Sequence, residues 1–463
     1  MNVVWRSSDL AKALSTKLNV ESVYGEVKFN SQHINKGDIF IALKKDKSDG
    51  HSYVKDAFER GASLAIISDD IENIDKNKVI KVEDSFIALN KMARYKRKNS
   101  KAKFIAVTGS IGKTTTKNII KQMLDLYGKT YATPASFNNY LGVPLSLASI
   151  PADAEYAVME IGMNAKGEID QLSEVVKPDI SLITSVDKCH IGFFKSLSEI
   201  ASAKSEIFNH LAKDKGIAIL NSSMNMLDQC LVHAKNLGVS DICLYGSSEQ
   251  DKVYLSNVER LENGSLRLKY VISESDYEVV TKMIPPYFAE NFAAGLAVLN
   301  SLSLDPELGL KAIANFEPDL GRGKIAEATD GDRKYDIICD YYNSNPKALE
   351  CSLSYLAELN NPNKVAVLGS MGELGEFESE LHGQMIEAIN NSGVKKLFLV
   401  GPPMQDIADQ FGDGIQVFDF KDSDQLAGSI KSSLNGGELI LIKGSRFHNF
   451  EKIAKMLGVK NAL

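Results

Sequence analysis

The stretch Val107–Thr116, which reads Val-Thr-Gly-Ser-Ile-Gly-Lys-Thr-Thr-Thr, constrains this chain more than any other part of its sequence. The apolar run 104–107 predicts a buried strand, and residues 117–127 predict a helix. A strand, a tight glycine turn and a helix N-terminus form a phosphate cradle, because backbone N–H groups and the positive end of the helix dipole face the anion. We therefore expect Lys113 to reach the β- and γ-phosphates of a nucleotide and the Thr114 hydroxyl to hold Mg²⁺.

The motif is a shorter variant, Gly-x-x-Gly-Lys-Thr, of the general phosphate-binding loop. The general pattern has another glycine ahead of these two, at the position that Val107 occupies here. An ordinary turn between a strand and a helix is the alternative interpretation. The Lys-Thr pair in this strand–turn–helix context favours phosphate binding.

The composition indicates a globular protein with a large core and no bias toward nucleic acid. Its 463 residues correspond to about three domains, and 44% of them are hydrophobic. The net charge of −7 argues against non-specific binding to nucleic acid. The N-terminus lacks the pattern of a signal peptide, and no apolar run reaches the roughly 18–20 residues that span a bilayer. The five cysteines include no Cys-x-x-Cys pair, as is typical of reduced thiols, so we expect a cytoplasmic protein.

Strand and helix signals divide the chain into three segments, which we expect to be domains: 1–98, 101–320 and 321–463. The polar run 98–101 is the expected linker between the first two. The basic residues at 94–98 are expected to form the solvated end of a helix that precedes this linker.

The alternation of strand and helix signals predicts an α/β fold in each segment. The first would be a smaller α/β domain, the central one a mostly parallel sheet with helices on both faces, and the last a Rossmann-like domain. Runs at 253–258 and 266–271 flank Asn263-Gly264 and predict a hairpin, with a third run near Val279. The other expected strands are 38–43, 64–67, 104–107, 156–161, 180–184, 217–220, 242–245, 336–339, 364–368, 396–400, 415–418 and 438–442, and the first segment adds helices near 53–60 and 85–98.

Two polar side chains of the central segment follow predicted strands. Glu160 ends the apolar run 157–160, and His190 comes after the strand 180–184 and its loop. The carboxyl ends of parallel strands meet at the crevice where ligands bind, and the phosphate-binding loop opens at the same edge. Glu160 is therefore a candidate Mg²⁺ ligand, with a surface carboxylate as the alternative. For His190 the spacing is equally compatible with a structural and a functional role.

A series of short motifs occurs in order along nearly the whole chain. They are 36–43, 108–115, 137–144 (Phe-Asn-Asn-Tyr-Leu-Gly-Val-Pro), 159–164 (Met-Glu-Ile-Gly-Met-Asn), 190–192, 203–207, 290–291, 321–322, 340–346 (Asp-Tyr-Tyr-Asn-Ser-Asn-Pro) and 367–375, which contains Gly-Glu-Leu-Gly. In this order they resemble the Mur ligases, the ATP-dependent amide ligases of bacterial cell-wall precursor synthesis. The resemblance is closest to the member that adds D-alanyl-D-alanine to UDP-N-acetylmuramoyl-tripeptide.

The resemblance implies roles for individual residues. The residues expected to bind the nucleotide are Gly109, Ser110, Gly112, Lys113, Thr114, Thr115, Asn291 (adenine), Arg322 and Asp340 (phosphate and ribose ends). The residues expected to be catalytic are Lys113, Glu160, His190 and Lys204, and those expected near metal are Thr114, Glu160, His190 and Lys204. The residues expected to contact the substrate are Ser31 (uridine diphosphate), Asn343, Asn345 and Arg446. For Arg446 the alternative is a structural salt bridge.

Lys204 matches the lysine that is carbamylated in Mur ligases. Carbamylation turns a cation into a carboxylate-like ligand that supports Mg²⁺. Without the resemblance, Lys204 would be interpreted as a solvated helix residue.

The implied activity is amide ligation through an acyl phosphate, by a monomer with ATP and Mg²⁺ as cofactors. The C-terminal domain would close over the site about hinges near 320–322, which protects the acyl phosphate from water. One alternative is a related ligase acting on another amino acid or on folate, but the Asp-Asn-Pro-Arg signature of the diaminopimelate- or lysine-adding member is absent. The other alternative is a non-catalytic nucleotide switch, which has no need of Glu160, His190, Lys204 and Asp340 together.

Overall fold

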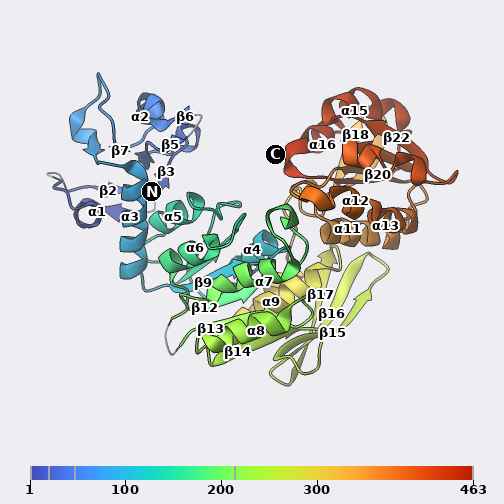
Figure 1. Ribbon diagram of the computed structural model, residues 1–463, viewed down its shortest axis with the longest axis horizontal. Helices are drawn as coiled ribbons and strands as arrows, with labels where there is room; N and C mark the ends of the chain where they lie inside the picture. Colours follow the sequence, from blue (N-terminus) through green and yellow to red (C-terminus); the bar gives the residue numbers. More distant parts are fainter. Residues whose placement is uncertain (1–2, 19–20, 46–47, 213–214, 461–463) are drawn as a thin grey trace.

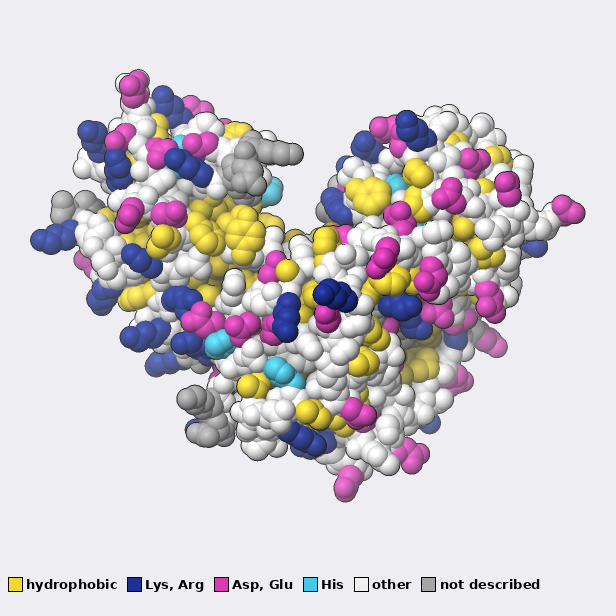
Figure 2. Space-filling model, in the orientation of Figure 1, with side chains coloured by type: hydrophobic (Ala, Val, Ile, Leu, Met, Phe, Trp, Pro, Cys, Tyr) yellow, Lys and Arg dark blue, Asp and Glu magenta, His cyan; other side chains and the backbone are white. Residues whose placement is uncertain are grey.

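The computed structural model describes residues 3–18, 21–45, 48–212 and 215–460. Figure 1 shows three α/β bodies arranged as a V. The N-terminal body (blue) and the C-terminal body (orange to red) both stand on the central body (green to yellow), and Figure 2 shows the open notch between the two arms. Within the described residues, no helix is long and apolar enough to cross a bilayer. The α/β class and the three-body layout predicted from the sequence are confirmed.

The N-terminal body is built on a four-stranded parallel sheet in the order β3-β4-β7-β8. The strands and helices predicted here are present as β4, β7, α2 and α3. Other strands of two or three residues were not anticipated, because such short runs carry no measurable hydrophobic period. The elements are β1 (Trp5–Arg6), α1 (Ser7–Leu14), β2 (Val23–Tyr24), β3 (Val27–Lys28), β4 (Ile39–Ile41), β5 (Lys44–Lys45), β6 (Ser48–Asp49), α2 (Val54–Glu59), β7 (Leu64–Ile67), β8 (Val79–Lys81) and α3 (Ser85–Asn99).

The basic run at the end of α3 is only partly solvated, as expected for Arg94 and Lys98 but not for Lys96 and Arg97, which are half-buried. Arg94 pairs with Glu174 through two contacts of 3.0 and 2.8 Å, and Arg97 donates to the carbonyl of Val176 at 2.6 Å. The ammonium group of Lys96 donates to the carbonyls of Val4 and Ile150, and burial lowers its pKa to about 8. The run therefore ties the N-terminal body to the central body. The expected linker is also shorter than predicted, because α3 continues through Asn99.

The central body holds a nine-stranded sheet in the order β10-β11-β9-β12-β13-β14-β15-β16-β17. Its strands are parallel from β10 to β15, and the predicted hairpin and third run add the antiparallel strands β16 and β17. The strands are β9 (Lys103–Thr108), β10 (Thr130–Ala132), β11 (Tyr156–Glu160), β12 (Ile180–Ile183), β13 (Ile217–Asn221), β14 (Asp241–Gly246), β15 (Val253–Arg260), β16 (Ser265–Ile272) and β17 (Ser275–Met283). Only β10 was not predicted; its three residues are all half-buried at the edge of the sheet.

Successive side chains of β9 point into two different cores. Ile105 and Val107 pack with α4 (Lys113–Leu124), α9 (Phe288–Ser301) and α10 (Pro306–Ala314). Phe104 and Ala106 pack on the other face, in the core that includes α5 (Gly142–Ala148), α6 (Glu168–Val176), α7 (Leu197–Ser205) and α8 (Leu227–Asn236). The sheet is therefore buried on both faces, as its continuous apolar strands predicted.

The C-terminal body is a six-stranded sheet in the order β18-β19-β23-β20-β21-β22. All neighbours are parallel except β18, which the sequence analysis missed and which pairs antiparallel with β19. Helices α11 and α13 cover one face, and α15 and α16 cover the other. The elements are β18 (Lys324–Asp330), β19 (Arg333–Cys339), α11 (Pro346–Glu358), β20 (Lys364–Gly369), α12 (Glu378–Gly383), α13 (Met385–Asn391), β21 (Lys396–Val400), α14 (Pro402–Gln405), β22 (Gln416–Phe420), α15 (Ser423–Ser429), β23 (Leu439–Lys443) and α16 (Glu451–Met456).

The register of the central sheet brings three strand ends to one edge. Glu160 at the end of β11 is the neighbour of Val107 on β9, and Ile183 on β12 is the neighbour of Thr108. The loop after β9 therefore opens between the end of β11 and the loop after β12.

Candidate functional site

A cavity of about 750 Å³ lies between the central and C-terminal bodies, at this edge of the central sheet. Its lining combines the loop after β9, the ends of β11 and β12, and residues that follow β19. The predicted site residues that line it are Ser110, Gly112, Lys113, Thr114, Thr115, Glu160, His190, Asn291, Arg322, Asp340, Asn343 and Asn345. Residues separated by more than 200 positions in the chain are thus brought together, as the sequence analysis expected for this group.

The loop between β9 and α4 has the backbone conformation that an anion cradle requires. Gly109 has φ of +154°, and a Cβ built there would lie 1.9 Å from the Thr184 hydroxyl. Gly112, the N-cap residue of α4, has φ of +81° and carries no side chain to cap the helix. The first N–H groups of α4 therefore point toward the cavity without a capping side chain, ready for an anion.

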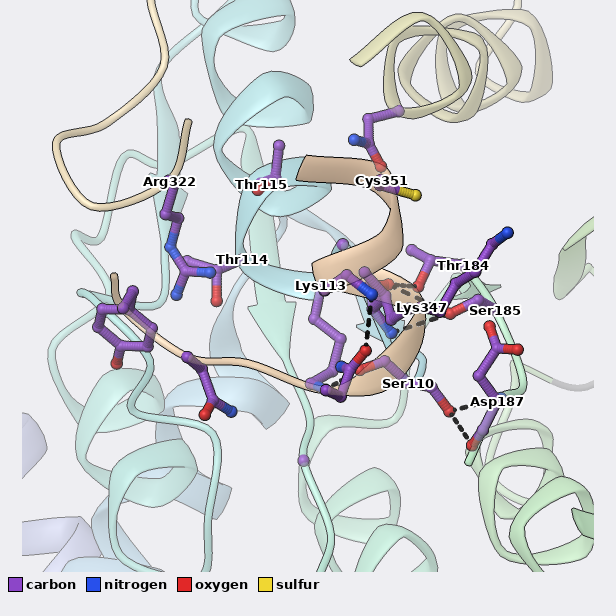
Figure 3. A pocket seen from close by; sticks show the side chains of 18 of the residues that line it. Ser110, Lys113, Thr114, Thr115, Thr184, Ser185, Asp187, Arg322, Lys347 and Cys351 are labelled. Atoms are coloured by element: carbon purple, nitrogen blue, oxygen red, sulfur yellow. Dashed lines mark hydrogen bonds between the residues drawn. The ribbon is translucent and has the colours of Figure 1, made fainter. Parts of the chain in front are cut away.

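Ser110 lies in this loop, and the side chain of Lys113, the first residue of α4, folds back onto it (Figure 3). The ammonium group of Lys113 donates to the carbonyl of Gly109 at 2.7 Å. The Ser110 hydroxyl donates to the carbonyl of Asp187 at 3.0 Å and accepts from its N–H at 2.9 Å. The loop after β12 thus holds the loop after β9 in place through Ser110, and the ammonium group of Lys113 lies against the carbonyl of Gly109.

Glu160 is a buried carboxylate with one oxygen that accepts no hydrogen bond from the described residues. Its Oε1 accepts a hydrogen bond from Asn138 at 2.8 Å. Its Oε2 is buried and has no hydrogen-bond partner among the described residues, and the ammonium group of Lys117 stands 3.8 Å away. A buried carboxylate oxygen that accepts no hydrogen bond is costly, and the ammonium group at 3.8 Å compensates only its charge. Since Thr114 and Glu160 line the same cavity, the oxygen donors present fit a Mg²⁺ ion. The alternative that Glu160 is a surface carboxylate is wrong.

His190 faces a carboxylate from the C-terminal body. Its Nδ1 lies 2.5 Å from Oε2 of Glu373, although the approach is too oblique for a regular hydrogen bond. Burial lowers the pKa of His190, but the Cys189 thiol and the Glu373 carboxylate outweigh burial and raise it to about 9.

Lys204 is buried in α7 rather than solvated. Its side chain is within the core of the central body, and only 2% of it is exposed. Burial, helped by the charge of Lys113, lowers the pKa of Lys204 to about 7. Lys204 lies outside the cavity lining, behind the loop that carries Asp187 and Cys189, whose charges act on it.

The C-terminal body contributes a second polar wall. Lys443 at the end of β23 donates to Asp340 at 2.7 Å, and the hydroxyl of Ser352 donates to the same carboxylate at 2.6 Å. The guanidinium of Arg322 lies 4.0 Å from the centre of the Tyr342 ring. Asn345 accepts from the N–H of Ala348 at 2.9 Å and thereby caps α11.

Asn291 joins the cradle to α9. Its Oδ1 accepts a hydrogen bond from the Thr116 hydroxyl at 3.1 Å, and a Cβ on Gly112 would lie 2.8 Å from the same oxygen. Asn291 therefore stands against the start of α4, next to the phosphate cradle.

Two predicted substrate residues, Ser31 and Arg446, do not line the cavity. Ser31 is buried in the N-terminal body, where its hydroxyl bonds to Asp56 and lowers the pKa of that carboxyl. Arg446 is half-exposed, pairs with Glu451 at 3.0 Å and lies 5.6 Å from the Tyr342 ring centre. The pairing with Glu451 is the contact that a structural salt bridge would make.

The sequence analysis missed several residues of the site. Asn138 holds Glu160, Lys443 holds Asp340, and Asp187 closes the cradle. Asn138 belongs to a motif and Asp187 to a loop noted in the sequence, and Lys443 follows the expected strand 438–442, but nothing local indicates their partners. Lys347 and Cys351, on one face of α11, also line the cavity, and both are labelled in Figure 3.

Comparisons with known proteins agree with this geometry. The model of the Mur ligase middle domain matches residues 107–299, and that of the Mur ligase, glutamate ligase domain, matches residues 322–446.

The UDP-N-acetylmuramoyl-tripeptide–D-alanyl-D-alanine ligase of Rickettsia prowazekii is 40% identical, over 97% of this chain and 99% of its own length. The crystal structure of MurF from Acinetobacter baumannii has a TM-score of 0.81 at 26% identity and covers 98% of both chains. MurF from Thermotoga maritima in complex with ADP has a TM-score of 0.76 at 26% identity, over 94% of this chain and 97% of its own. With the resemblance confirmed over nearly its full length, the chain belongs to the Mur ligase family.

Proposed function

We propose that this chain is an ATP-dependent ligase that joins D-alanyl-D-alanine to UDP-N-acetylmuramoyl-tripeptide in peptidoglycan precursor synthesis. The observation that carries the proposal is one cavity that combines a phosphate cradle with a buried carboxylate oxygen on Glu160 that accepts no hydrogen bond from the described residues. The near full-length similarity to a relative with this activity in its name supports the choice of substrates.

In the proposal, each of the three bodies has a separate role in binding or closure. Residues 1–98 bind the uridine diphosphate end of the substrate, with Ser31 near it, and residues 101–320 bind ATP. Residues 321–463 close over the site about a hinge near 320–322. Closure suits the open notch of the V, since the acyl phosphate must be kept from water.

The nucleotide would lie with its phosphates in the cradle. The N–H groups between Gly109 and Thr115, the Ser110 hydroxyl and the Lys113 ammonium would hold the phosphates. Asn291 would contact the adenine, and Arg322 and Asp340 would contact the phosphate and ribose ends. Arg322, stacked on Tyr342, is free to use its guanidinium edge for hydrogen bonds to an anion.

Mg²⁺ would be held by the Thr114 hydroxyl and Oε2 of Glu160, with His190 and Lys204 serving a second ion. When bound, Mg²⁺ would neutralise charge on the phosphate oxygens during transfer. Lys204 would first react with CO₂: its neutral amine forms a C–N bond, loses a proton and becomes an N-carboxylate. A pKa near 7 leaves enough neutral amine for this reaction.

The chemistry then proceeds in two displacements. A carboxylate oxygen of the tripeptide attacks the γ-phosphorus, the bond to ADP breaks, and an acyl phosphate forms. The amine of D-alanyl-D-alanine attacks the acyl carbon, phosphate leaves with the electrons of the C–O bond, and the nitrogen loses a proton. Lys113 offsets the charge on the transferring phosphoryl group, and the cradle N–H groups keep it in line. Asn343, Asn345 and Arg446 would position the two peptide substrates on the C-terminal side.

The test is phosphate release by the full-length protein with ATP, Mg²⁺, UDP-N-acetylmuramoyl-tripeptide and D-alanyl-D-alanine, omitting one component at a time. We expect release only with all components, together with a UDP-pentapeptide product by mass spectrometry. Release with another amino acid in place of the dipeptide would identify a sister ligase. Release with ATP alone would favour a nucleotide switch.

A further inference from the structure

Two loops of different bodies meet backbone against backbone beside the cavity. One, residues 187–194, precedes α7 and reaches up to the C-terminal body near α12 in Figure 1; the other is residues 371–377. The N–H of Gly192 donates to the carbonyl of Glu373 at 3.0 Å. A Cβ built on Gly192 would lie 2.7 Å from the nitrogen of Gly375, and one built on Gly375 would lie 2.8 Å from Cα of Gly192. Since neither position can accept a side chain without movement, this junction requires both glycines.

The same junction carries the contact between His190 and Glu373. Both residues have left-handed backbone conformations, with φ of +60° and +64°, which are uncommon for residues other than glycine. Their side chains meet at 2.5 Å between Nδ1 and Oε2, with the His190 ring largely buried. Strained conformations persist only where surrounding structure holds them, and here the two strained residues hold each other across two bodies.

The orientation of the His190 ring determines which of its two nitrogens can bind a ligand in the cavity. Nδ1 faces the carboxylate, and His190 lines the cavity, so Nε2 is the nitrogen left for a ligand there. A histidine that binds a metal commonly has its other nitrogen held by a carboxylate, which fixes the ring and raises its basicity. In this chain the carboxylate comes from the opposite body.

We propose that Glu373 is a positioning residue that holds the His190 ring for a divalent cation, and that it can do so only while the bodies are docked at Gly192 and Gly375. The proposal rests on the proposed function, in which His190 serves a metal. Because linkage is reciprocal, a cation at His190 would strengthen docking by the same factor by which docking strengthens cation binding. Any movement of the C-terminal body that separates this junction would then also release the His190 ring and weaken the metal site.

The first test compares Glu373→Gln with Glu376→Gln, a matched change at an exposed carboxylate of the same loop. Binding of Mn²⁺ to the full-length protein with a non-hydrolysable ATP analogue is followed by the electron paramagnetic resonance signal of free Mn²⁺. We expect Glu373→Gln to weaken binding of one Mn²⁺ ion about 10-fold or more, and Glu376→Gln to leave both affinities unchanged. Affinities within twofold of wild type in Glu373→Gln would overturn the proposal.

The second test separates position from charge. Gly192→Ala keeps His190 and Glu373 but forces the two backbones apart, whereas Gly383→Ala has no atom within 4 Å of the added Cβ. Gly192→Ala should weaken Mn²⁺ binding as much as Glu373→Gln does, with Gly383→Ala matching wild type. Wild-type Mn²⁺ affinity in a folded Gly192→Ala protein would refute the link to docking. If Gly192→Ala does not fold, the Glu373 comparison decides alone.

Turnover supplies the last readout. Glu373→Gln should raise the Mg²⁺ concentration needed for half-maximal rate and should change the KM for D-alanyl-D-alanine little. A loss of kcat that is the same at every Mg²⁺ concentration would contradict a positioning role. The Mn²⁺ measurement needs no turnover. A wild-type protein that binds Mn²⁺ but forms no product would therefore refute the proposed function without deciding against Glu373.

Discussion

Lys204 should react with CO₂ at neutral pH, in contrast to an exposed lysine. Carbamate formation requires the neutral amine, and burial together with the charge of Lys113 lowers the pKa of Lys204 from 10.5 to about 7. At pH 7 about half of the amine is then neutral, compared with roughly 0.03% for a lysine with an unshifted pKa. The reactive fraction is thus raised roughly a thousand-fold. Because the pKa is lowered, the neutral form appears as the pH rises through about 7 and is lost at lower pH.

The assay is carbon-13 NMR of the protein equilibrated with ¹³C-labelled bicarbonate, at constant dissolved CO₂ and a series of pH values. We expect one carbamate resonance whose intensity rises with a midpoint near pH 7. Lys204→Arg should abolish it, and Lys215→Arg, at an exposed lysine, should leave it intact. A resonance that survives Lys204→Arg, or a midpoint above about pH 10, would refute the reasoning.

Three further predictions follow from single contacts. Gly112→Ala combines a left-handed φ of +81° with a 2.8 Å approach to Asn291, so calorimetry should show ATP binding weakened about tenfold or more. Glu160→Gln removes the negative charge that would bind the cation, so product formation should fall about 100-fold or more, and the thermal midpoint should fall because buried Lys117 loses its counter-charge. Trp5→Phe removes the 2.7 Å bond from the indole to the carbonyl of Ala148 and should destabilise docking of the N-terminal body by about 1–2 kcal/mol. Hydrogen exchange of that body would measure the last effect, and unchanged protection would contradict it.

Strand positions in the two larger bodies were predictable because their signals are local. A buried parallel strand is a short, continuous apolar run, and β9, β11, β12, β20 and β23 all have this pattern. The edge strands β10 and β18 were missed because half-buried, mixed sequences carry no such run. The basic run 94–98 was misinterpreted in part, for a related reason. Composition alone does not show that Lys96 and Arg97 donate hydrogen bonds to the carbonyls of Val4, Ile150 and Val176, which are distant in the sequence.

By itself, the sequence determined the α/β class, the phosphate cradle and the family, because glycine turns, apolar runs and ordered motifs are properties of neighbouring residues. Only the tertiary structure decided which of the polar residues are buried and what faces them. Among the described residues, one buried oxygen of Glu160 accepts no hydrogen bond, and Lys204 has a lowered pKa, because of the core packed around them. His190 meets Glu373 because two bodies dock, although the two residues are 183 positions apart in the chain. Solvation and charge depend on every atom nearby in space, and no local pattern in a chain records that environment.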